Sequence, residues 1–350
     1  MTHSHVAIAM GGGKRESNME LLRIIAMFLV MMIHTTQTIH YPEFDGKEVT
    51  QAEFLFVSFL RAISFVAVNV FVLLSGWFSI KYSLKGLLKL LYQVLFFSIL
   101  CYGFSILCGI ETFSIRQLLL EGFLVGIDNY WFVQSYVVLF LLSPLLNSFC
   151  DNADKRMFKK VLSTYFCVIF AGAWMTQSLS GEFEAGLSTV FFIGLYILAR
   201  YIRIYTPSFA NKTLRFDALI FLSISALITI IALLTHGGSF VISNIFTYTC
   251  PLIVVSSVYL LLGFSKMKFQ SKLINTIASS CFAVYLLHEH VSICKPLYRT
   301  MIRDLYYAET PYTYKWLDIV VFMLIVYIAA VLFDKIRYLS FKEIIKLVKI

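Results

Sequence analysis

The chain has 350 residues, of which 59% are hydrophobic and only 14% are charged, and it carries a formal net charge of +9. A soluble domain of this size cannot bury so much apolar surface in one core, so a soluble enzyme is excluded and lipid is the expected solvent. The positive charge does not indicate a nucleic-acid partner, because Lys and Arg accumulate in the cytoplasmic loops of membrane proteins. None of the seven cysteines forms a CxxC pair, so neither a metal site nor a disulfide framework is expected.

The predicted elements begin with residues 1–17, which have no apolar core of signal-peptide length and are expected to form a disordered cytoplasmic lead-in. Residues 18–338 are predicted to form one integral membrane domain, because no stretch between their apolar runs is long enough for a soluble domain. Ten of these runs approach the length that crosses the ~30 Å hydrocarbon layer, so the fold class is predicted to be all-α with about ten transmembrane helices. Their expected bounds are 19–39, 54–80, 86–108, 131–149, 159–178, 186–205, 216–235, 241–263, 273–293 and 316–334.

Two shorter segments are predicted to lie on the membrane instead of crossing it. Residues 115–126, "IRQLLLEGFLVG", are too few and too charged to span, and they indicate an interfacial or re-entrant helix. Residues 339–350 are predicted to form an amphipathic helix on the inner leaflet. With the N-terminus cytoplasmic, 21 of the 29 Lys and Arg fall on the cytoplasmic side and six fall outside, and this asymmetry predicts that both termini are cytoplasmic.

The first predicted span, "LLRIIAMFLVMMIH", holds two polar side chains, Arg23 and His34. Eleven residues at ~100° each make about three turns, so both side chains share one helix face and lie about 16 Å apart along the axis. Ionisable groups at such depth are costly and normally face a bundle interior or a wet cavity. The alternative is that Arg23 reaches the inner headgroups and that His34 is a hydrogen-bonded core residue.

Four phrases follow one another along the chain: "RIIAMFLVMMIH" at 23–34, "FVLLSGW" at 71–77, "YWFVQSYVVLFLLSP" at 130–144 and "CFAVYLLHEH" at 281–290. Their order resembles the membrane-bound acyltransferase-3 family over nearly all of 17–338. The resemblance implies transfer of an acyl group, most often acetyl, from cytoplasmic coenzyme A to a hydroxyl of a glycan. It therefore implies an O-acetyltransferase of the bacterial cytoplasmic membrane, with acetyl-CoA as donor substrate, a polysaccharide or lipid-linked glycan as acceptor, and membrane lipids as the remaining partners.

On this resemblance, His34 is expected to act as the base on the acceptor hydroxyl or to carry the acyl group covalently. Arg23 is expected to engage the anionic donor or its thioester carbonyl. Many members of the family have a cytoplasmic Arg-x-x-Arg after the second helix, where this chain has Lys81, Lys85 and Lys89. These lysines share a helix face, so Lys85 and Lys89 are the candidate ligands of the coenzyme A phosphates, and ordinary positive-inside residues are the alternative.

The acceptor side is predicted from residues near the outer surface. Arg61 lies at a depth similar to that of His34, about 10 Å below that surface, and is a candidate ligand for an acceptor sugar or phosphate. His288 is expected to line or support the acceptor site, whereas His290 is expected at the interface. Trp131 is expected to stack on a sugar or to belong to the aromatic belt. The competing function is a transporter or flippase of a lipid-linked glycan, although the paired Gly/Pro-broken helices typical of transporters are not found in the sequence.

Overall fold

The computed structural model describes residues 15–39, 50–122, 130–175, 186–235 and 244–348, and all regular structure in these ranges is helical. The predicted all-α class is therefore confirmed for the described residues. The α-helices are α1 Ser17–Ile39, α2 Gln51–Ser64, α3 Val66–Phe78, α4 Leu84–Leu107, α5 Ile115–Gly122, α6 Trp131–Asn152, α7 Lys155–Met175, α8 Thr189–Tyr205, α9 Leu214–Leu234, α11 Pro251–Ser265, α12 Lys272–Ala278, α13 Cys281–His288, α14 Val291–Ile293, α15 Thr300–Tyr307 and α16 Tyr312–Val348. Two short elements complete the set, a 3₁₀-helix η2 Ser208–Asn211 and a π-helical turn η3 Cys294–Arg299.

Six helical segments among the described residues are long and apolar enough to cross a membrane: α1, α2 with α3, α4, α6, α9 and α16. The segments Lys272–His288 and Val291–Tyr307 pass the same test only as a pair, bent by 64°. The predicted spans at 159–178, 186–205 and 241–263 correspond to α7, α8 and α11, which are helical but are not among the six. The count of ten and the orientation of the termini stay predictions.

Three predicted helices differ from the observed ones in where they break or begin. The span 54–80 is divided at Phe65, which ends α2 by donating its backbone N–H to the Arg61 carbonyl. Within the predicted span 241–263, residues 246–249 form bends and turns, and α11 starts at Pro251, a residue type that favours the first helical position. The span 273–293 breaks after His288.

The two ends of the predicted membrane domain differ in what the structure describes. The predicted lead-in lies almost entirely outside the described residues, and α1 begins at Ser17. The predicted separate helix at 339–350 is instead a continuation of the last span, since α16 runs for 37 residues without a break. Residues 115–122 of the predicted interfacial helix form α5, and 123–126 lie outside the described residues.

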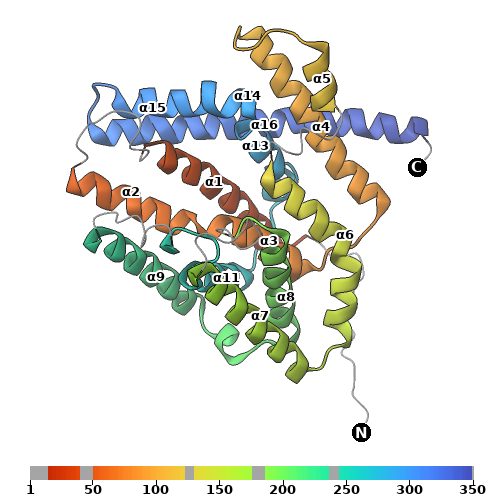
Figure 1. Ribbon diagram of the computed structural model, residues 1–350, viewed down its shortest axis with the longest axis vertical. Coiled ribbons are helices and arrows are strands. Elements are labelled where there is room, and N and C mark those ends of the chain that lie inside the picture. Colours follow the sequence, from red (N-terminus) through yellow and green to blue (C-terminus); the bar gives the residue numbers. More distant parts are fainter. Residues whose placement is uncertain (1–14, 40–49, 123–129, 176–185, 236–243, 349–350) are drawn as a thin grey trace.

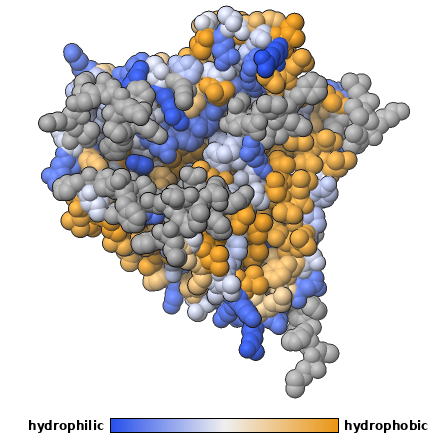
Figure 2. Space-filling model, viewed as in Figure 1, coloured by the Kyte–Doolittle hydropathy of each residue, from blue (hydrophilic) through white to orange (hydrophobic). Residues whose placement is uncertain are grey.

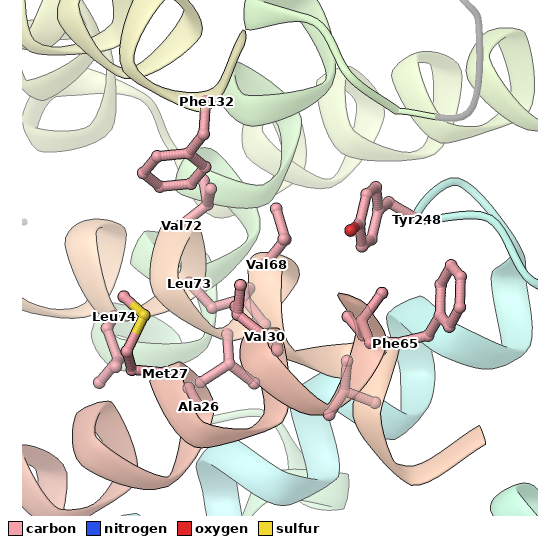
Figure 3. Packing of buried hydrophobic residues seen from close by; sticks show 14 of the residues in the cluster. Ala26, Met27, Val30, Phe65, Val68, Val72, Leu73, Leu74, Phe132 and Tyr248 are labelled. Carbon is pink, nitrogen blue, oxygen red and sulfur yellow. The ribbon is translucent and has the colours of Figure 1, made fainter. Parts of the chain in front are cut away.

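Helix α1 occupies the centre of the bundle. It packs against α2, α3, α11, α12, α13 and α16, and most of its residues are buried (Figure 1). Met27 and Val30 of α1 pack beside Val68 of α3, and Phe132 of α6 and Tyr248 approach this pair of helices from above in Figure 3. The face of α1 that carries Met27, Val30 and His34 is therefore directed towards α3 and α6.

The outside of the bundle is largely apolar, as a lipid-facing surface requires. Figure 2 shows apolar side chains over the flank formed by α6 and along the lower left edge of the molecule, and hydrophilic side chains at the lower end below α7. Inside, α3 and α8 approach closely at Gly76, where a Cβ atom would lie 2.4 Å from the Tyr196 carbonyl oxygen. This contact fixes α3, and with it one wall of the site described next.

Candidate active site

The sequence His288–Glu289–His290 lies where the bent pair of helices breaks. Glu289 ends α13 with φ −98° and ψ −2°, and His290 is extended with φ −58° and ψ 135°. His290 is the N-cap of the next helix, α14, because its Nδ1 accepts a hydrogen bond of 3.2 Å from the Ser292 backbone N–H. Within a membrane, non-helical backbone is tolerated only where protein buries it or a cavity is lined by it. The break is thus a place where polar groups are held inside the bundle.

His34 of α1 contacts His288 across this bundle interior. Nδ1 of His34 lies 2.9 Å from Nε2 of His288, and the two ring centroids are 5.1 Å apart. Nδ1 of His288 lies 2.5 Å from the Val284 carbonyl oxygen one helical turn earlier. The His288 ring is completely buried and packs against Tyr298, with 5.2 Å between the ring centroids. Two histidines that are 254 positions apart in the sequence therefore form one hydrogen-bonded pair.

Glu289 is the carboxylate of the same cluster. Its Oε2 lies 3.5 Å from His34 Nε2, beyond the usual hydrogen-bond distance, so this contact is electrostatic. Its Oε1 accepts a hydrogen bond of 2.9 Å from the Cys294 thiol and lies 3.6 Å from Nη2 of Arg299. Cys294 and Arg299 are the first and last residues of η3, and a π-helix joins residues five apart. One π-helical turn thus directs both side chains to one carboxylate.

A narrow cavity of about 30 Å³ lies beside His34. This volume accommodates about two water molecules, so a substrate enters only if side chains move. The cavity is aromatic and aliphatic apart from the imidazole, and Trp131 stacks on Tyr248 with 6.0 Å between ring centroids and 27° between planes. The lining residues are Met27, Val30, His34, Val68, Phe71, Trp131, Phe132, Tyr248, Phe282 and Tyr285.

The structure brings three of the sequence-predicted residues, His34, His288 and Trp131, to one place and leaves the basic ones elsewhere. Arg23 pairs with Glu20 at 2.5 Å, about 16 Å along the axis of α1 from His34. Arg61 is not in the histidine cluster, since its guanidinium carbon lies 4.6 Å over the Phe246 ring. Arg61 therefore contacts the aromatic layer behind the cavity.

The two lysines predicted to bind the donor lie on the surface of α4. Lys85 and Lys89 are exposed and one turn apart, and Lys89 Nζ lies 5.9 Å from the centroid of the Tyr338 ring of α16. The shared helix face that the spacing predicted is present. The two ammonium groups are accessible to a phosphate on that face.

The prediction that His290 lies at the interface is wrong. His290 is completely buried, and its Nε2 lies 3.4 Å from Oε2 of Glu121 on α5. Glu121 also accepts a hydrogen bond of 2.9 Å from Gln117 Nε2, and Tyr130 donates one of 2.6 Å to the Leu286 carbonyl nearby. The spacing of two did direct His290 away from His288, but the helix breaks there and α5 covers the side to which His290 points.

Four residues of this region were not identified from the sequence: Glu121, Glu289, Cys294 and Arg299. Glu289 carried a usable signal, because it is a carboxylate inside a predicted span and stands between two histidines. The other three lie in or near loops, and only the bend of the chain brings them to the histidines. Among the described residues, no group of three or more His, Cys, Asp or Glu is arranged to hold a metal ion.

These features define a class: a multi-pass helical membrane protein with a buried histidine–carboxylate cluster beside a cavity. The sequence model of the acyltransferase domain family, acyltransferase-3, matches residues 16–334. The chain belongs to this family, which confirms the resemblance of the motifs and gives its activity class as acyl transfer. Comparison with curated proteins and with solved structures gives no match.

Proposed function

We propose that this protein is a membrane O-acyltransferase that moves an acetyl group from acetyl-CoA to a hydroxyl of a cell-surface or lipid-linked glycan in the cell membrane. The observation that carries the proposal is the position of His34, which lines the cavity and also contacts His288 and Glu289. An imidazole that reaches both a substrate space and a partly buried carboxylate is suited to general-base catalysis.

The chemistry requires one proton to be removed and returned. The acceptor hydroxyl oxygen attacks the thioester carbonyl carbon as its proton passes to His34, and the carbon–sulfur bond then breaks. The proton moves from His34 to the coenzyme A sulfur, so the products are the ester and the free thiol. Glu289, 3.5 Å away, stabilises the imidazolium formed between these two steps. In the covalent variant, His34 attacks the thioester carbonyl carbon, the carbon–sulfur bond breaks and coenzyme A leaves as its thiolate. The hydroxyl then attacks the acyl-histidine, which releases the ester and neutral His34, and the hydroxyl proton ends on the thiolate.

Donor binding is proposed for the positive groups on α4 and at the start of α1. Lys85 and Lys89 offer two accessible ammonium groups to the diphosphate of coenzyme A, with Lys89 steadied over an aromatic ring. Arg23, about 16 Å from His34 along α1, is proposed to bind a phosphate of the donor, and only after it has left Glu20, the carboxylate with which it now pairs. Coenzyme A must displace the Glu20 carboxylate from Arg23, so only a strongly anionic group such as a phosphate is expected to bind there.

Acceptor binding is proposed at the aromatic wall of the cavity. Trp131 and Tyr248 form a stacked pair there, and aromatic faces pack well against the apolar faces of sugar rings. Arg61 lies one aromatic ring further out, over Phe246, where it can meet a sugar or phosphate group. His288 is completely buried, which favours a supporting role over direct contact with the acceptor.

The test uses membrane vesicles that contain the full chain, acetyl-CoA labelled in the acetyl group, and chemically deacylated surface glycan. The proposal expects label to become fixed on the glycan and to be released by mild base, as an ester would be. Vesicles with His34→Ala are the matched control and should fix none. Glycan that crosses the membrane without label would instead identify a transporter, and transfer of succinyl in place of acetyl would revise the donor.

A further inference from the structure

The hydrogen bonds around the two histidines determine which ring nitrogen carries a proton. A carbonyl oxygen only accepts, so the bond to Val284 requires that Nδ1 of His288 is the donor. A neutral His288 then has its lone pair on Nε2. The partner 2.9 Å away, Nδ1 of His34, must therefore donate. A neutral His34 is left with its lone pair on Nε2, the nitrogen that faces Glu289.

A charged His288 would change this assignment, but its surroundings disfavour a charge. The ring is completely buried, and the structure places around it the His34 ring, the Val284 carbonyl and the rings of Tyr285 and Tyr298, in the part of the chain that it describes. Two charged groups also act on the ring, Glu289 and Arg299, but they are of opposite sign and pair with each other. The ring's own hydrogen bonds go to His34 and to the Val284 carbonyl, so neither charge is its direct partner. Burial of an unpaired charge is costly, so the neutral assignment holds for His288.

Glu289 and His288 favour opposite tautomers of His34. A carboxylate next to Nε2 stabilises the tautomer in which Nε2 carries the hydrogen and donates it. The bare Nε2 of His288 stabilises the tautomer in which Nδ1 donates. The Nδ1 contact is the shorter, 2.9 Å against 3.5 Å, and it is the one within hydrogen-bond distance. The lone pair of His34 is therefore held on Nε2, on the side of Glu289. A proton that binds there forms an imidazolium that the Glu289 carboxylate stabilises.

We propose that His288 is a positioning residue that holds His34 in its Nδ1–H tautomer, so that Nε2 is the atom that takes the acceptor proton. The proposal rests on the proposed role of His34 and replaces the expectation that His288 contacts the acceptor. In the reaction, the acceptor O–H bond breaks as the Nε2–H bond forms, while Nδ1–H stays bonded to His288. Nε2 later returns its proton to the coenzyme A sulfur, and His288 ends in its starting state.

The first test is spectroscopic and needs no activity. The full chain, labelled with ¹⁵N-histidine and placed in lipid bilayers, is examined by solid-state NMR above the usual titration range of histidine. His34→Asn identifies the His34 signals by their loss. The expected result is a protonated Nδ1 and an unprotonated Nε2 in His34. A protonated Nε2 in His34 of the unmodified protein would overturn the proposal.

The second test removes the acceptor of the Nδ1 hydrogen bond. In His288→Leu, Glu289 alone directs the tautomer, so the hydrogen of His34 should move to Nε2. The kcat should then fall by up to about 10⁴-fold, the loss that a wrong histidine tautomer causes in a serine protease. KM for acetyl-CoA should stay within about threefold, since uniform binding is not affected. In His288→Gln, the amide oxygen can accept from Nδ1–H, so the tautomer and most of the activity should return. An unchanged His34 signal in His288→Leu would refute the assignment.

A matched control separates this effect from general destabilisation. His290 is equally buried and only two residues away, so His290→Leu should lower the unfolding temperature while the His34 signals keep their unmodified pattern. A shift of the His34 tautomer in His290→Leu as well would make the effect structural and sink the proposal. Loss of the proposed function is recognised separately: if His34→Ala keeps acyl transfer, the catalytic role fails, whereas the NMR assignment stands or falls by itself.

Discussion

The helix break carries two histidine–glutamate pairs, and they are built differently. In the His290–Glu121 pair, the side chains are 0% and 2% exposed. Nδ1 of His290 accepts from the Ser292 N–H, and the carboxylate lies 3.4 Å from Nε2, almost as far as Glu289 lies from Nε2 of His34. In the His34–Glu289 pair, the side chains are 12% and 16% exposed, and a bare nitrogen faces the carboxylate. The first pair is more deeply buried, and because Nδ1 of His290 accepts a backbone N–H, its Nε2 carries the hydrogen that points to the carboxylate. In the second, more exposed pair, the proposed tautomer leaves Nε2 of His34 without a hydrogen.

The difference separates a pair that stabilises the fold from a pair that can react. A buried group with all its hydrogen bonds made contributes stability and has no free valence for a substrate. A nitrogen lone pair held beside a carboxylate and next to a cavity attracts a proton, and the acceptor hydroxyl can supply it. His288 and His290 are the same residue type, two positions apart and equally buried, so their hydrogen-bond partners decide their roles.

The largest difference in activity is expected between two variants that truncate one histidine of each pair, His34→Ala and His290→Ala. His34→Ala should lower kcat by about 10²–10⁴-fold, the usual contribution of a general base, with an unfolding temperature close to that of the unmodified protein. His290→Ala should lower the unfolding temperature and keep more than about a third of the turnover per folded molecule, because it leaves His34 and Glu289 in place. Turnover assays and thermal unfolding in the same detergent check both. Similar losses of turnover in the two variants would remove the distinction.

The carboxylates give the second comparison. Glu289→Gln keeps the shape but removes the charge that stabilises the imidazolium, so kcat should fall about 10–10²-fold. Glu121→Gln should change kcat by less than about twofold, since an amide oxygen still accepts from Nε2–H of His290. The two variants are compared at saturating acetyl-CoA. A strong loss in Glu121→Gln with a normal Glu289→Gln would assign the two roles the other way round.

Trp131 and Tyr130, neighbours in sequence, allow the cavity to be compared with the buried surroundings of the His290–Glu121 pair. Trp131 lines the cavity, whereas the hydroxyl of Tyr130 donates to the buried Leu286 carbonyl. Trp131→Leu should raise KM for the glycan about tenfold with kcat nearly kept, because a binding surface common to ground and transition states is lost. Tyr130→Phe should leave KM unchanged and cost about 1 kcal/mol of stability through one lost hydrogen bond. A glycan KM that does not respond to Trp131→Leu would place the acceptor elsewhere.

The smallest effect on activity is expected when the carboxylate of the buried His290–Glu121 pair is removed. Glu121→Ala leaves the His290 donor buried without its carboxylate, which should cost about 1–3 kcal/mol in stability. Turnover per folded molecule should stay within about threefold of the unmodified protein. Chemical denaturation followed by Trp fluorescence measures the first quantity, and the acetyl-transfer assay measures the second. A variant of normal stability would show that α5 is held by other contacts.

Much of the helical framework could be predicted, because apolar runs bounded by polar residues define membrane helices. The prediction 19–39 for the first span agrees with α1 within two residues, and Arg23 and His34 share one helix as expected. The breaks at Phe65 and after His288 were missed, since neither is marked by a nearby proline or glycine. The chain bends by 64° after His288, whereas α2 and α3 meet at Phe65 within one span, and local propensity marks neither break.

The candidate site was predictable only in part, because spacing along one helix says nothing about what faces it. His34 and Trp131 were both selected from the sequence, and they line one cavity in the structure. The contact of His34 with His288, by contrast, joins helices far apart in sequence. His290 was misplaced because a straight helix was assumed where the backbone turns by 64°. Glu289 could have been found from its cost alone, since a carboxylate in an apolar run needs a partner.

The unbroken last helix has a consequence for what lies beyond the bilayer. A helix of 37 residues is about 55 Å long, and even at the steepest common tilt of ~40° a ~30 Å layer covers only about 40 Å of it. Roughly 15 Å of α16, a rigid helical rod, must therefore lie outside the hydrocarbon layer. Asp334 of α16 accepts a hydrogen bond from Gln93 of α4 and another from Arg337 of its own helix, so the Gln93 contact ties α16 to α4. A fluorophore attached to the rod near Lys342 would thus sit at a fixed height above the membrane, and that height would report any tilting of α4 and α16 during turnover.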